Sequence, residues 1–163
     1  PDWRDALVGA RLSLLTDGPP GLRVLPDTRQ LDLAVESSRL NCGQARPCQG
    51  ADLVSVTADR PWGPNNPVWV LFAHANLAAA VPGGGAGPLP YVAVWIADDP
   101  EETDGDPFTD GGGPPGTNPG AGLLIVHAEA WGPRGSRRLV EATIARDQGQ
   151  PLGVQVRSWS EGP

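Results

Sequence analysis

Apolar and polar residues alternate along the second half of the chain with the period of two that β-strands show when one face is buried. This pattern predicts strands at residues 91–96, 123–131, 138–146 and 154–159. Residues 132–135, Gly-Pro-Arg-Gly, form a turn that joins two of them. Because hairpin-like connections join neighbouring strands in opposite directions, the four strands predict an antiparallel sheet.

The alternation also assigns side chains to the faces of this sheet. In 123–131, one face carries Leu124, Val126, Ala128 and Ala130, and the other carries Leu123, Ile125, His127, Glu129 and Trp131. In 138–146, Val140, Ala142 and Ile144 point inward, and Glu141, Thr143 and Ala145 point outward. In 154–159, Val154, Val156 and Ser158 lie opposite Gln155, Arg157 and Trp159. One face is therefore expected to pack against an apolar element.

The first half of the chain is expected to be less regular. Residues 1–9 resemble the last turns of a helix, with Trp3, Ala6 and Leu7 on one face and Gly9 as the stop. Residues 16–50 are rich in turns. The other predicted elements are short strands at 22–25 and 31–35, a short helix at 51–58, a strand at 68–73 and a helical turn at 75–81, whereas the proline-rich 60–67 cannot be helical.

Together these elements predict an α+β fold in which residues 1–163 form a single globular domain. The end of an N-terminal helix would pack on a four-stranded antiparallel sheet. Its long loops would be rich in glycine and proline, because the chain has 22 glycines and 19 prolines. Few long helices are predicted to cover the sheet, so we expect the covering helix to lie partly upstream of residue 1.

The charges exclude several classes of function. All 12 basic residues are arginines, which excludes a P-loop and a Schiff-base lysine. The net charge is −7, and seven of the 19 acids fall between residues 98 and 110. The rest of the chain is therefore formally neutral, with 12 acids and 12 arginines. Neither nucleic-acid binding nor a polybasic membrane surface is expected from this distribution.

The acidic segment is the one constellation with distinctive chemistry. Crowded carboxylates repel one another, and either full solvation or a hard divalent cation relieves that repulsion. Calcium accepts six to eight oxygens from glycine-punctuated loops of this kind, although the spacing is not that of an EF-hand. No cofactor is required, but a Ca²⁺ site is a candidate, with Asp98, Asp99, Asp104, Asp106 and Asp110 as ligands.

Two cysteines, Cys42 and Cys48, lie six residues apart. A disulfide would close a short loop and would indicate the periplasm, the cell surface or the outside of the cell. Two free thiols are the alternative. A zinc site would need further ligands, and the two histidines, His74 and His127, are isolated in apolar runs.

No motif predicts catalysis, and we expect no enzyme. The chain has no G-x-S-x-G nucleophile motif, and the glycine run at 83–87 lacks the dinucleotide pattern. Glu129 and Glu141 lie on neighbouring predicted strands and could approach each other as a carboxylate pair does in glycosidases. Arginines flank them, so a cross-strand salt bridge is the expected outcome.

Several segments resemble the PilX-like minor pilins of bacterial type IV pili. They are 1–9, 60–69, 91–96 with the following acidic loop, 127–143 (His-Ala-Glu-Ala-Trp-Gly-Pro-Arg-Gly-Ser-Arg-Arg at its start) and 156–159. The resemblance implies a pilin-like fold, in which the second half of a long N-terminal helix packs on a four-stranded antiparallel sheet. It also implies that membrane contact occurs only through the apolar first half of that helix, upstream of residue 1.

The resemblance further implies a non-catalytic role in the priming and tip complex of a pilus, in assembly and adhesion. The partners would be other minor and major pilins and a large tip adhesin. The protein would be anchored in the inner membrane and then reach the cell surface within the pilus. Candidate interaction residues are three aromatic anchors and three basic residues at a hairpin tip, namely Trp62, Trp69, Trp131, Arg134, Arg137 and Arg138.

Two other classes of function stay open from the sequence. A secreted calcium-dependent binding or adhesion module would use the acidic segment without any role in pili. A small secreted hydrolase would use His127 and Glu129. The tryptophans could also be core residues, and the arginines could be a solvated turn.

Overall fold

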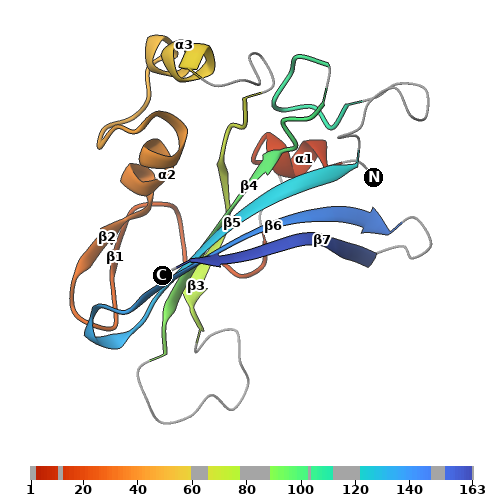
Figure 1. The fold of residues 1–163 in the computed structure, drawn as a ribbon. Helices are drawn as coiled ribbons and strands as arrows, with labels where there is room; N and C mark the ends of the chain where they lie inside the picture. Colours follow the sequence, from red (N-terminus) through yellow and green to blue (C-terminus); the bar gives the residue numbers. More distant parts are fainter. Residues whose placement is uncertain are drawn as a thin grey trace.

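A computed structural model describes residues 3–10, 13–59, 66–77, 89–102, 104–111, 122–147 and 153–162. Its centre is a five-stranded antiparallel sheet in which each strand pairs with the next along the chain (Figure 1). The strands are β3 Val70–Asn76, β4 Tyr91–Asp98, β5 Leu123–Trp131, β6 Arg137–Asp147 and β7 Gly153–Gly162. The antiparallel α+β fold is confirmed, but the sheet has five strands instead of four because β3 joins its edge.

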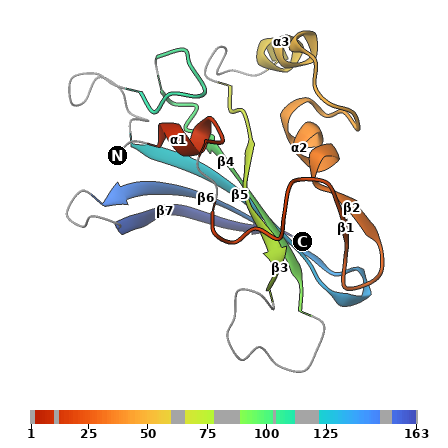
Figure 2. The ribbon, with the colours of Figure 1, turned by 180° about the vertical axis from the view of Figure 1, so that it is seen from behind.

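The elements before the sheet are short (Figures 1 and 2). They are α1 Arg4–Leu7, a hairpin of β1 Leu22–Val24 and β2 Gln30–Asp32, α2 Leu33–Cys42 and α3 Gly50–Asp59. Among the described residues, no helix is both long and apolar enough to cross a membrane. Most of the predicted helical turn at 75–81, most of 60–67 and the glycine run at 83–87 lie outside the described residues, and Ala75 and Asn76 belong to β3.

Helix α2 was not expected, and the strand predicted at 31–35 ends at Asp32. The Asp32 side chain caps the helix, because Oδ1 accepts hydrogen bonds from the N–H groups of Ala34 and Val35 at 2.9 and 3.3 Å. Gly43 ends it in the left-handed conformation, with φ 69°. Both signals stand in the sequence at the two ends of α2, and the helix they delimit covers the sheet.

Apolar side chains of the sheet form two clusters, one on each face. On one face, Trp95, fully buried, packs with Leu33 and the β1–β2 hairpin. On the other face, Ile96 and Leu124 pack with Ala6 and Leu7 of α1. The short helix α1 therefore packs on one face of the sheet, and both faces are partly covered. Ala145, predicted to point outward into solvent, is 4% exposed.

A bulge between β6 and β7 changes the predicted faces of the last strand. Thr143 pairs with Ser158 and Ile144 pairs with Val156, so Arg157 has no counterpart on β6. The extra residue places Trp159 opposite Ala142. Paired residues of antiparallel strands share a face, so Trp159 lies on the face of Val156, and the predicted placement on opposite faces is wrong.

The two edges of the sheet differ. Along β3, residues 13–17 run parallel to the strand, and the His74 N–H donates to the Leu15 carbonyl at 2.9 Å. The Asp17 carboxylate fixes this segment by accepting a hydrogen bond from Arg23 at 2.8 Å, with the His74 ring nitrogen 2.9 Å away. Strand β7 ends the sheet on the other side, and none of the described segments pairs with its outer edge.

Cys42 and Cys48 form a disulfide, with their Cα atoms 6.1 Å apart, that links the end of α2 to the segment before α3. Replacing both cysteines with serine should lower the free energy of unfolding by about 2 kcal/mol, because the unfolded chain loses a short closed loop. Urea denaturation of the double variant and of the oxidised protein measures the difference. Reduced wild type should match the variant, and equal stability of all three would contradict the prediction.

Candidate functional site

Strand β7 is exposed along almost its whole length. Residues 154–161 are all exposed, and Val154, Val156 and Trp159 keep 54%, 58% and 59% of their surface in solvent. Val156 and Trp159 pair with Ile144 and Ala142 of the neighbouring strand β6. The exposed apolar side chains of β7 therefore lie on the same face of the sheet as α1. The last strand is thus an open edge with an apolar flank.

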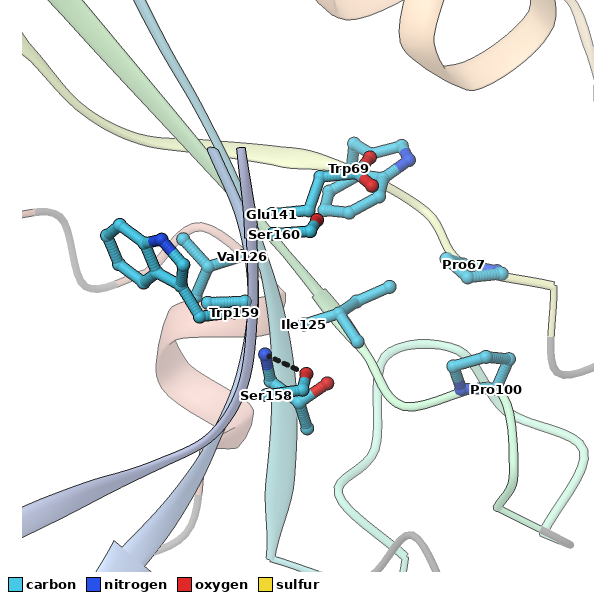
Figure 3. Close-up of a pocket in the computed structure, with 11 residues that line it drawn as sticks. Pro67, Trp69, Pro100, Ile125, Val126, Glu141, Ser158, Trp159 and Ser160 are labelled. Atoms are coloured by element: carbon cyan, nitrogen blue, oxygen red, sulfur yellow. Dashed lines mark hydrogen bonds between the residues drawn. The ribbon is translucent and has the colours of Figure 1, made fainter. Parts of the chain in front are cut away.

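A groove of about 400 Å³ lies on the opposite face of β5, β6 and β7. Figure 3 shows Trp69, Pro67 and Ile125 on one side of these strands, with Trp159 and Val126 on the other side. The polar side chains of Glu141, Ser158 and Ser160 also line the groove. Strand β7 is therefore accessible to solvent on both faces of the sheet, through the groove on one face and through its exposed apolar side chains on the other.

His127 lies beside this groove between two carboxylates. Its Nε2 is 3.0 Å from Glu129 Oε1, and its Nδ1 is 3.3 Å from Glu141 Oε1. Arg137 donates from Nε to the second oxygen of Glu129 at 2.7 Å. The rings of Trp69 and Trp95 meet the imidazole edge-on, with centroids 5.6 and 5.9 Å away. The expected cross-strand salt bridge is present between Arg137 and Glu129, and the His127 ring lies between the two glutamates.

The surroundings shift the pKa values of this pair in opposite directions. Burial alone lowers the pKa of His127, but its hydrogen bonds to Glu129 and Glu141 and their charges raise it overall. Burial alone raises the pKa of Glu129, but its bonds to His127 and Arg137 lower it overall. The stability from His127 is complete below about pH 6.5 and is lost as the pH rises through its raised pKa. The stability from Glu129 is lost as the pH falls through its lowered pKa.

This geometry fits a structural ion pair better than a catalytic base. Both ring nitrogens of His127 face carboxylates, and its side chain is only 6% exposed. The contacts with these two carboxylates occupy both ring nitrogens, so neither nitrogen is free to take a proton from a substrate. The hydrolase hypothesis therefore draws no support from the contacts of His127 and Glu129.

The predicted interaction residues have different environments. Trp62 lies outside the described residues, Trp69 is half-buried against the core, and Trp131 is 5% exposed within it. Arg134 and Arg138 are exposed, whereas Arg137 pairs with Glu129. Sequence reasoning missed Trp159 as an exposed aromatic residue. The sequence did carry a signal for it, because Trp159 is a large apolar residue in the last predicted strand, and the last strand of a sheet can lie at its edge.

The five predicted calcium ligands are also divided. Asp98 and Asp99 are buried, at 3% and 7% exposure. Asp104 and Asp106 are exposed, and each accepts the backbone N–H two residues later. Asp110 accepts the Gly122 N–H at 2.6 Å. Within the described part of the chain, no three Asp, Glu, His or Cys side chains converge as a metal-binding group.

Comparison with known proteins identifies no relative: no protein-family model, no curated protein and no solved structure matches the chain.

The raised pKa of His127 is directly measurable. In an NMR titration, the His127 ring should show a midpoint above pH 6.5, and Glu141→Gln should lower that midpoint because one of the two partner charges is lost. The spectrum of His127→Gln assigns the resonance against that of His74. A wild-type midpoint at or below pH 6.5 would show that burial outweighs the two glutamates.

Proposed function

We propose that the chain is a minor pilin of a type IV pilus, a non-catalytic component of the priming and tip complex that acts in assembly and adhesion. Its partners are other minor and major pilins and a large tip adhesin. The sequence resemblance supports this proposal, as does the packing of the short helix α1 on an antiparallel sheet. The disulfide fits a site of action in the periplasm and at the cell surface.

The open edge of β7 is the observation that carries the proposal. An exposed edge strand offers unpaired N–H and C=O groups to a strand of another chain, and natural sheets usually cover or blunt such edges. In this sheet, residues 13–17 run along β3, whereas β7 is exposed. The proposed occupant is an edge strand of a neighbouring pilin subunit, which pairs with β7 and extends the sheet.

The side chains of β7 add selectivity to this backbone pairing. Val156 and Trp159 present apolar surface on one face, and Arg157 and Glu161 supply charges of both signs. A partner strand therefore needs apolar residues on the matching face and complementary charges along its length. Trp159 is the expected anchor, because buried tryptophans dominate the binding energy of protein interfaces.

Replacing Trp159 with serine should weaken binding to a partner subunit by at least about tenfold, because an aromatic anchor contributes about 2 kcal/mol or more. Biolayer interferometry with the purified ectodomains of the pilins encoded in the same gene cluster measures the change. Val54→Ser is the matched control, since Val54 is 69% exposed on α3, away from the sheet edge. Equal affinity of wild type and both variants would remove β7 as the docking edge.

The class of protein has its own test in the gene. If the chain is a pilin ectodomain, the open reading frame upstream of Pro1 should encode a leader peptide followed by about 20 apolar residues, enough to span a bilayer as a helix. Sequencing the upstream region is sufficient. A start codon followed by neither feature before Pro1 would end the pilin interpretation, and a secreted binding module would take its place.

A further inference from the structure

Asp98 is buried at the end of β4, and one of its two carboxylate oxygens lacks a hydrogen bond. It pairs with Leu124 of β5, shares the face of Ile96 under α1 and is 3% exposed. Its Oδ1 atom is fully buried and accepts no hydrogen bond. No arginine or histidine in the described part of the chain forms an ion pair with Asp98. Burying a carboxylate in this way is costly, so a missing partner is expected.

A second acidic side chain, Glu102, is buried in the turn that follows β4. The Glu102 N–H donates to the Asp99 carbonyl at 3.1 Å, which closes a tight turn directly after β4. The Gly111 N–H donates a hydrogen bond to Glu102 Oε2 at 2.6 Å, which links residue 111 to the turn after β4. Glu102 is 2% exposed. Three acidic residues, Asp98, Asp99 and Glu102, are thus buried within five residues of chain.

The electrostatics agree with this geometry. Burial raises the pKa of Asp98 to about 8, and the nearby charge of Glu102 is the next cause, followed by Asp110 and Asp104. Arg146 places its guanidinium over the Trp3 ring, 5.5 Å from the ring centroid, and forms no ion pair with Asp98 among the described residues. At neutral pH this cluster therefore favours the uptake of positive charge, either as a proton or as a metal ion.

We infer that Asp98 and Glu102 form a binding site for a divalent cation of the Ca²⁺ type. Hard cations of this kind bind carboxylate oxygens and accept irregular coordination from loops, which Mg²⁺ tolerates less well. Because no third acidic, histidine or cysteine side chain among the described residues converges on the pair, main-chain carbonyls and water complete the shell. Asp104 and Asp106 are excluded, since both are exposed and hold local turns. This ligand set replaces the five aspartates expected from the sequence.

Calorimetric titration with CaCl2 at pH 7.5 tests the inference on wild type, Asp98→Asn and the control Asp104→Asn/Asp106→Asn. Wild type should bind one Ca²⁺ ion and melt several degrees higher with Ca²⁺ than with EDTA, because a ligand bound only to the folded state stabilises it. Asp98→Asn should lose at least about tenfold in affinity, whereas the double control, which removes twice the charge from the same loop, should bind as wild type does.

Melting in EDTA at pH 8 separates the site from mere loss of structure. Asp98→Asn should melt higher than wild type there, because the folded protein no longer buries an ionisable carboxylate with one oxygen that accepts no hydrogen bond. No heat of binding and no change in melting temperature at about 5 mM Ca²⁺ would overturn the inference. The buried negative charge would then be compensated by a proton instead of a metal ion. An equal loss of Ca²⁺ affinity in Asp98→Asn and in the double control would also overturn the inference, because it would show that the acidic loop attracts the ion only through its overall charge. If Asp98→Asn does not fold, Glu102→Gln takes its place with the same expected loss.

Discussion

Adjacent residues of β4 pack into two different hydrophobic clusters, because Trp95 points to one face of the sheet and Ile96 to the other. This constraint buries the middle of the sheet on both sides with very little helix. The elements that cover the centre of the sheet do not extend over β7, and this last strand is exposed on both faces. The contrast between a doubly buried centre and a bare edge gives the protein both its stability and its available surface.

The same burial decides which polar groups need partners. Strand β5 carries Glu129 into the interior, where His127 and Arg137 neutralise it. Strand β4 carries Asp98 to equal depth, but no cation of the described chain pairs with it. The two sites lie on neighbouring strands but on opposite faces of the sheet. Arg137, at the start of β6, reaches Glu129, whereas all the charged residues of the loop that follows β4 are acids.

Much of this arrangement could be predicted from the sequence, where local alternation decides the structure. Strand β5 spans the predicted residues 123–131, and the approach of Glu129 and Glu141 follows from the hairpin between them. Other features depend on distant contacts. The bulge at Arg157 turns Trp159 to the other face, and no local pattern marks where an extra residue enters a ladder. Nor does alternation reveal that His127 pairs directly with Glu141, since that register depends on the length of the turn.

The bulge also limits what the open edge can do. An even, flat edge of this length would pair with almost any exposed strand, and its exposed Val154 and Val156 would make it prone to aggregation. The extra residue at Arg157 interrupts the ladder and places a charge where the strand bends. Under the proposed strand pairing, a partner would have to accommodate this bend and place an acidic side chain near Arg157 while it covers Trp159. The irregularity that sequence reasoning missed would then be the feature that makes pairing at β7 selective.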